Sequence, residues 1–333
     1  MRGSTLLGVA RAVLVLAALA VLAAVSPAPA LETGRIFVSS ERDHGLTVLD
    51  GKTLEKVTVL KTGNRPRHLR LSADRKLLYV AASDSHRVDV VDVASLKVVD
   101  RLDVGPDPEV FDISPDGKTM YVGNEDDAEL TFFDMQSRKK VGTVKVGAEP
   151  EGVLAHPDGK IVYVASEVAN MIHVVDVASR KITENILVGN RPRRMVLTPD
   201  LKELWVPAEL GGTVSIIDTA TNKVVGEIKF EPKGFRPDDL TPVGITMTRD
   251  GKRAYVGLGR ANHVAVISVP DRKVTGYTLV GKRAWNVVLT RDEKTLYVCN
   301  GLSDDLSVVD TATLKVSRSV PVGRVPYMAI IDD

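Results

Sequence analysis

The stretch VGAEPEGVLAHPDGKIVYVAS, residues 146–166, runs from a glycine turn through an apolar segment and a Pro-Asp-Gly turn into an alternating apolar strand. Close variants of this stretch recur along the chain. The glycine of the first turn returns at steps of 42 residues, with a single step of 92, at Gly63, Gly105, Gly147, Gly189, Gly281 and Gly323. An aromatic residue before valine and an aspartate after a valine-rich segment keep a matching spacing, so the chain is built from repeats.

Each repeat predicts four short strands, because runs of Val, Leu and Tyr alternate with polar residues and end at turn residues. In the first repeat we expect these strands at about 67–72, 77–82, 87–92 and 97–102. Four strands in about 40–45 residues are typical of a β-propeller blade. We number the repeats as blades 1 to 6, with the bounds 61–102, 103–144, 145–186, 187–228, 229–278 and 279–320.

The two ends of the repeat region complete a seventh blade. Residues 321–333 match the first strand of a repeat, and residues 33–60 match the other three. Pairing them closes the ring with its own ends, which leaves no sheet edge free to pair with another chain. The sequence therefore predicts one all-β domain over residues 31–333, a seven-bladed β-propeller with four antiparallel strands per blade.

The first thirty residues have a different character and predict a signal peptide. Arg2 and Arg11 precede an apolar run of 14 residues, Ala12–Val25, and small residues follow up to Ala30. We expect cleavage near Ala30, export to the periplasm and no membrane contact after cleavage. A retained anchor is the alternative, but a membrane span needs about 20 apolar residues.

Composition narrows the function classes. The formal net charge of +1 falls to −1 when the two arginines of the signal peptide are removed, so no basic surface for nucleic acid is indicated. Cys299 is the only cysteine, so the chain forms no internal disulfide and has no C-x-x-C-H motif for covalent haem.

Three repeated features are expected to be scaffold. The Pro-Asp-Gly triplets 115–117 and 157–159 predict tight turns with glycine at positive φ. The repeated aromatic residues are expected to pack between blades. The repeated aspartates are expected to accept hydrogen bonds within their own turns, at Asp92, Asp134, Asp176, Asp218 and Asp310.

The candidate site lies where the repeat carries varied side chains. The residues after the turn proline, and the loops after each second strand, are expected on one face around the channel mouth. They form an acidic sector in blades 2 and 3, a basic sector in blade 4 and an aromatic sector near the closure. The expected ligand-binding residues are Arg67, His68, Glu109, Glu125, Asp126, Glu151, Glu167, Arg193, Arg194, Glu209, Trp285, Asn286, Asn300 and Tyr327.

Several chemistries remain open for these residues. Glu109 and Glu151 could form a catalytic carboxylate pair, whereas Glu149 is expected to face solvent. Glu109, Glu151 and Glu125 could together hold a divalent cation. The six histidines do not form a ligand cluster, and His68 is the histidine nearest to the channel. The extra residues of blade 5, within 229–243, predict an ordered loop on the same face.

The blade pattern, seen in VGPDPEVFDISPDGKTMYVGN (104–124), resembles the YVTN family of β-propellers. Further stretches are similar to the PQQ-dependent catabolism-associated β-propeller proteins, among them VGAEPEG (146–152), NRPRRMVLTPDLKELWVPAELGGTVSIID (190–218), FEPKGFRPDDLTPVGITMT (230–248) and GKRAWNVVLTRDEKTLYVCNG (281–301). This resemblance implies a periplasmic protein that works near a quinoprotein dehydrogenase system. It implies no reaction, because the subfamily has no catalytic motif to carry over.

We therefore expect a non-catalytic binding or accessory protein that takes a small anionic ligand or a partner's loop at the channel mouth. If the ligand is pyrroloquinoline quinone (PQQ), Arg67, Arg193 and Arg194 would pair with its carboxylates and Trp285 could stack on its ring. The alternatives are a propeller lactonase, which would use Glu109 or Glu151, and a carrier of haem d1. A purely structural or adhesive propeller is a further alternative.

Overall fold

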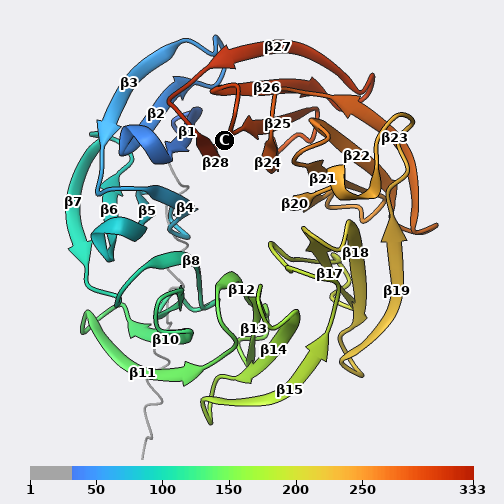
Figure 1. The fold of residues 1–333 in the computed structure, drawn as a ribbon. Coiled ribbons are helices and arrows are strands. Elements are labelled where there is room, and N and C mark those ends of the chain that lie inside the picture. The colour runs from blue at the N-terminus through green and yellow to red at the C-terminus, as the bar shows by residue number, and fades with distance from the viewer. Residues whose placement is uncertain (1–31) are drawn as a thin grey trace, which may run out of the picture.

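The structure is a computed structural model that describes residues 32–333, so the predicted signal peptide lies outside the described residues. Seven four-stranded antiparallel sheets form a ring around a central axis (Figure 1). This confirms the predicted all-β, seven-bladed β-propeller. In blades 1 to 6 the strands follow chain order from the channel to the outer rim.

The first three blades are regular. Blade 1 contains β4 (Pro66–Leu71), β5 (Leu77–Ala82), β6 (Arg87–Asp92) and β7 (Lys97–Leu102). Blade 2 contains β8 (Pro108–Ile113), β9 (Thr119–Asn124), β10 (Glu129–Asp134) and β11 (Lys139–Lys145). Blade 3 contains β12 (Pro150–Ala155), β13 (Ile161–Ser166), β14 (Met171–Asp176) and β15 (Lys181–Leu187).

The next three blades include the least regular one. Blade 4 contains β16 (Val196–Leu197), β17 (Glu203–Ala208), β18 (Thr213–Asp218) and β19 (Lys223–Lys229). Blade 5 contains β20 (Pro242–Met247), β21 (Arg253–Leu258), β22 (His263–Ser268) and β23 (Lys273–Leu279). Blade 6 contains β24 (Ala284–Leu289), β25 (Thr295–Asn300), β26 (Asp305–Asp310) and β27 (Lys315–Pro321). The short 3-10 helices η1 (Glu41–Asp43), η2 (Ser83–Ser85) and η3 (Pro237–Asp239) lie in loops.

Blade 7 closes the ring as predicted. It combines the C-terminal β28 (Pro326–Asp332) with β1 (Arg35–Ser40), β2 (Gly45–Asp50) and β3 (Lys56–Lys61), and β28 pairs with β1 next to the chain's C-terminus (Figure 1). Asp332 stabilises this closure: it accepts hydrogen bonds from the backbone N–H of Thr33 (2.8 Å) and from Arg75 Nε of blade 1 (2.7 Å).

The inner strand of blade 4 is shorter than its counterparts because of a proline. Pro207 lies in the neighbouring strand β17 and has no N–H to donate to the ladder. Around it only an isolated bridge between Pro192 and Ala208 remains before β16 begins. The segment that carries Arg193 and Arg194 is therefore outside the regular ladder.

The hydrophobic core lies between adjacent blades. Tyr121 of blade 2, for example, packs with Val153 and Val162 of blade 3, and Tyr163 of blade 3 packs with Leu204 and Val206 of blade 4. The repeated aromatic residues thus have the predicted packing role.

The repeated turns also have the predicted geometry. Gly117 and Gly159 both have a φ of 72°. The side chain of Asp92 accepts a hydrogen bond from the backbone N–H of Ser95 at 2.7 Å, and the same turn bond recurs at Asp134, Asp176, Asp218 and Asp310. These residues are accounted for by the scaffold.

Candidate functional site

A bulge in the inner strand of every blade except blade 4 sets the direction of the site residues. Pro108 pairs with Asn124 and Val110 with Gly123, so Glu109 between them has no partner in the ladder. Such an extra residue bends the strand and re-aims its side chain. The equivalent second positions of the seven inner segments form what we call the channel ring, consisting of Arg67, Glu109, Glu151, Arg193, Val243, Trp285 and Tyr327.

The charged members of the channel ring neutralise one another. Arg67 is 4% exposed and contacts the Glu109 carboxylate directly. Its Nη2 lies 3.2 Å from Glu151 Oε1, and its Nε lies 3.3 Å from Glu41 Oε1. One guanidinium thus joins carboxylates from blades 2, 3 and 7 to blade 1. The predicted carboxylate pair meets through this arginine.

Arg193 occupies the corresponding place in blade 4. Its Nη1 lies 2.9 Å from Glu151 Oε1, and its Nε donates to Glu209 Oε2 at 2.8 Å. It also contacts the carboxylate of Glu167. The sequence placed acids and arginines in separate sectors. The ring keeps that order, and ion pairs across the sector boundaries join the acids and arginines into one buried network.

The three central carboxyl groups differ in the direction of their pKa shifts. The pKa of Glu151 is lowered to about 2, because burial disfavours its charge but Arg67 and Arg193 outweigh that effect. Burial raises the pKa of Glu109 well above its ordinary range, against the pull of Arg67. Burial also raises the pKa of Glu167 to about 8, with the Glu151 charge adding to the shift against Arg193.

Two aromatic residues complete the ring. The guanidinium of Arg67 lies 4.3 Å from the centroid of the Tyr327 ring, and that of Arg193 lies 5.8 Å from the Trp285 centroid. Trp285 needs the glycine opposite it, since a Cβ at Gly301 would be 2.2 Å from its Nε1. Trp285 is therefore stacked among arginines of this chain.

A cavity of about 190 Å³ lies in the channel. It is on the side of the ring away from the loop face, the face that carries the loops after each second strand. It is lined by the third to fifth residues of the inner strands, including His68, Arg70, Asp112, Arg194, Asn286 and Met328. The side chain of Arg70 is 46% exposed, so this cavity opens toward the face that carries the Pro-Asp-Gly turns.

Arg194 and His68 are the cavity residues with unused hydrogen-bonding capacity. Arg194 Nη2 donates to the Tyr327 hydroxyl at 2.9 Å. Its Nη1 is buried and has no hydrogen-bond partner among residues 32–333, and the same holds for His68 Nδ1. Burial lowers the pKa of His68, and the charge of Arg194 lowers it further, so the imidazole is neutral at pH 7.

The remaining predicted residues are divided between the site and the scaffold. Asn286 lines the cavity and donates to the Tyr327 carbonyl at 2.9 Å. Asn300 is buried and donates to Asp305 Oδ1 at 2.6 Å, which is a structural role. Asp126 is exposed on its loop. Glu149 is half-buried at a φ of 54°, whereas solvent exposure was expected.

Three carboxyl groups converge beside the ring, at Asp107, Glu109 and Glu125, with oxygen atoms within 4.8 Å of one another. The predicted cation set contained Glu151 in place of Asp107. Both Glu109 oxygens contact arginines, Arg65 at 2.8 Å and Arg67 more closely. These positive charges oppose a cation at this position.

The residue that precedes each turn proline, or its equivalent, was not predicted to belong to the site. Arg65 and Arg283 hold this place in blades 1 and 6, at positive φ, and pair with Glu109 (2.8 Å) and Glu209 (3.1 Å). The 42-residue period was the available signal, since Arg191 has the same position in blade 4.

The other histidines near the loop face are structural. His44 Nδ1 accepts a hydrogen bond from the backbone N–H of Arg65 at 3.1 Å, and His86 Nδ1 accepts one from Asp107 at 3.0 Å. Their equivalent positions therefore reflect the repeat and not a shared ligand.

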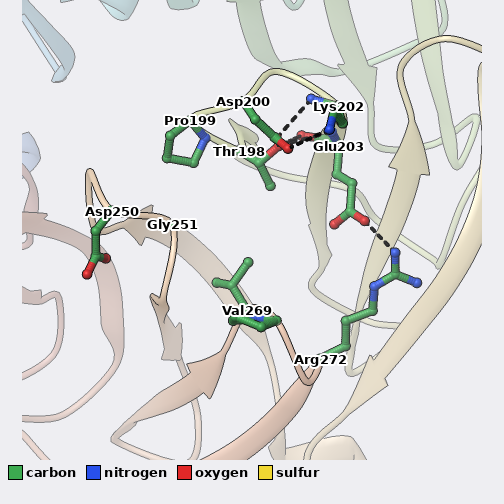
Figure 2. A pocket seen from close by; sticks show the side chains of 10 residues that line it. Thr198, Pro199, Asp200, Lys202, Glu203, Asp250, Gly251, Val269 and Arg272 are labelled. Atoms are coloured by element: carbon green, nitrogen blue, oxygen red, sulfur yellow. Dashed lines mark hydrogen bonds and ion pairs between the residues drawn. The ribbon is translucent and has the colours of Figure 1, made fainter.

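The hollow shown in Figure 2, of about 370 Å³, lies between the turns of blades 4 and 5 on the opposite face. Its polar groups bind one another: Thr198 donates to Asp200 at 2.7 Å, and Arg272 pairs with Glu203. The same turn bond recurs between Ser114 and Asp116, beside a smaller hollow between blades 1 and 2. The hollow is thus a product of the repeat.

Comparisons with known proteins support the fold class. A family model described as YNCE-like beta-propeller matches residues 37–158. A search of curated proteins finds no match. In the described part of the chain no helix is long and apolar enough to cross a membrane.

Solved structures with the same architecture have diverse activities. The hydrazine synthase of Kuenenia stuttgartiensis is 24% identical with a TM-score of 0.76, covering 84% of this chain and 93% of that one. A periplasmic gluconolactonase of Pseudomonas aeruginosa is 16% identical with a TM-score of 0.74, covering 89% and 98%. A dihydro-heme d1 dehydrogenase, NirN, is 19% identical with a TM-score of 0.69, covering 94% and 78%. At these identities the similarity establishes the β-propeller fold alone.

Proposed function

We propose that this protein is a non-catalytic binding β-propeller that holds a small anionic ligand in the channel cavity. One observation carries the proposal: Arg194 lines the cavity and has a buried guanidinium nitrogen without a hydrogen-bond partner in the described chain. A buried donor without a partner costs free energy. An anion bound there would supply that partner through a charge-assisted hydrogen bond.

The other two arginines of the predicted site are less suited to a ligand. Arg67 and Arg193 are each 4% exposed and already contact several carboxylates. A ligand that displaced one of these would leave a buried carboxylate unpaired, which is strongly unfavourable. The proposed site is therefore inside the channel and not at the loop-face mouth.

As part of this proposal, the protein is exported to the periplasm and works beside a quinoprotein dehydrogenase system, as its sequence resemblance implies. The quinone itself does not fit this site as it stands. Two of the three arginines it would need are paired, and about 190 Å³ is less than the roughly 300–1,000 Å³ of pockets for drug-sized ligands. A smaller anion suits the cavity better.

A thermal-shift titration with acetate, propionate, phosphate and PQQ tests this function. A free ligand concentration of about 100 times Kd should raise the free energy of unfolding by roughly 2.7 kcal/mol. Arg194→Met should abolish the shift, whereas Arg236→Met, at a side chain that is 90% exposed, should retain it. If no anion shifts the melting temperature, the proposal is overturned.

A lactonase activity is the second candidate, and Glu167 favours it. This carboxyl group lines a hollow of about 300 Å³ between blades 3 and 4, with Arg191, Asn170 and Leu210. Burial raises its pKa to about 8, toward the range that suits a general acid at neutral pH.

A hydrolysis assay with gluconolactone, corrected for the spontaneous reaction, tests the second candidate. Activity in the parent protein that falls at least 100-fold in Glu167→Gln would support a lactonase. No activity above the spontaneous rate, or equal activity in the variant, would eliminate Glu167 as its acid.

A further inference from the structure

The channel cavity contains a second unpartnered polar atom besides Arg194 Nη1, and this limits the ligand further. His68 is neutral, so one ring nitrogen carries a hydrogen and the other accepts. Its Nδ1 is buried and has no hydrogen-bond partner in residues 32–333. A ligand hydroxyl can both donate and accept, so it would satisfy Nδ1 in either tautomer.

The position of His68 is held by packing. Its ring meets the Phe111 ring edge-to-face, with centroids 4.9 Å apart. Rotation of the ring to a different partner would break this contact. The Nδ1 atom of His68 is therefore fixed in the same cavity that Arg194 lines.

The charges of the groups that line the cavity sum to +1. Arg70 pairs with Asp112, its Nε lying 2.9 Å from Oδ1, and these two charges cancel. Arg194 is the remaining cation, because its hydrogen bond goes to the neutral hydroxyl of Tyr327. A ligand with one negative charge balances the cavity.

The rest of the wall is largely apolar. Leu154, Met195, Val287 and Met328 contribute carbon and sulfur surface. Such a wall favours a short carbon skeleton between the polar groups. It disfavours a second charged group.

We propose that the ligand is a small hydroxy monocarboxylate, whose carboxylate binds Arg194 Nη1 and whose hydroxyl forms a hydrogen bond with His68 Nδ1. This inference rests on the proposed function and adds the ligand's chemical class. Simple carboxylates satisfy Arg194 but leave His68 Nδ1 without a hydrogen-bond partner.

Titration calorimetry with lactate and propionate tests the proposal, since these acids differ only in the hydroxyl. We expect lactate to bind about tenfold more tightly, because a buried hydrogen bond that one ligand cannot make changes affinity by about this factor. His68→Phe keeps an aromatic ring but removes Nδ1, so the ratio should fall to about one. His263→Phe, at a histidine outside the cavity lining, should leave the ratio at about ten.

The outcomes separate the two proposals. Equal binding of both acids by the parent protein overturns the hydroxy-acid inference and leaves anion binding standing. Binding of neither acid, together with no anion-dependent thermal shift, overturns both. A tenfold preference that persists in His68→Phe would also overturn the role given to His68.

A second measurement covers the case in which His68→Phe does not fold. In ¹⁵N-labelled protein, the Nδ1 resonance of His68 should shift when lactate is added and should not shift with propionate. An unchanged resonance at saturating lactate would contradict the proposed hydrogen bond.

Discussion

Arg67 shows how much of this site is decided by single side chains. It extends from blade 1 and contacts carboxylates of three other blades. Removing one partner of a buried ion pair costs roughly 3–5 kcal/mol, because the other charge is left unpaired and out of water. The ring therefore depends on the presence of every member.

Glu151→Gln should destabilise the protein at pH 7 and have little effect in acid. The folded-state pKa of Glu151 is about 2, below its ordinary 4.5, because Arg67 and Arg193 outweigh the effect of burial. Its ionisation contributes about 3 kcal/mol above pH 4.5, and this contribution is lost as the pH falls toward 2. Urea unfolding of the parent and variant proteins from pH 7 to pH 3 measures the difference.

The exposed Glu184→Gln is the matched control and should have no effect at any of these pH values. A difference between parent and Glu151→Gln that stays constant with pH would contradict the assigned ionisation.

At the scale of elements, the insertion between β19 and β20 has an anchored base and an exposed tip. Phe230 and Leu240 are 4% and 5% exposed and pack in the core between blades 4 and 5. Phe235 is 36% exposed, and its ring lies 5.3 Å from that of His263. Both ends of the predicted ordered loop are therefore packed in the hydrophobic core.

Replacement of the two phenylalanines should separate these roles. Phe230→Ala should cost about 3–5 kcal/mol, as is usual for a buried phenylalanine. Phe235→Ala should cost less than about 1 kcal/mol, because its side chain keeps much of its exposure when folded. The free energy of unfolding in urea measures both, and equal losses would show that the tip is as well packed as the base.

At the scale of the whole molecule, Asp332 ties the two ends of the described chain to blade 1. Its side chain accepts hydrogen bonds from Thr33 and Arg75 and is fully buried. Asp332→Ala should lower the free energy of unfolding by about 3 kcal/mol, since charged hydrogen bonds are lost together. Asp103→Ala, at an exposed position, is the control and should change it little. A similar loss of unfolding free energy in both variants would contradict the role of Asp332 in closing the ring.

The fold was predictable because it repeats. Turn glycines, aromatic residues and aspartates at a common spacing indicated four strands per unit, and the two unmatched ends indicated the closing blade. The shortened inner strand of blade 4 was not foreseen, although Pro207 is visible in the sequence. Its effect depends on which residue lies opposite it across the ladder.

The sequence alone determined the blade count, the closure and the kinds of side chain near the channel, because a 42-residue period assigns each residue to a blade and a strand. Only the tertiary structure decided the partners. Arg67 meets Glu151 across a blade between them, and Tyr327 holds Arg194 from the far end of the chain. The curvature of the blade ring brings these residues together around one axis, and the inner-strand bulges direct their side chains. Neither effect follows from a spacing along the chain.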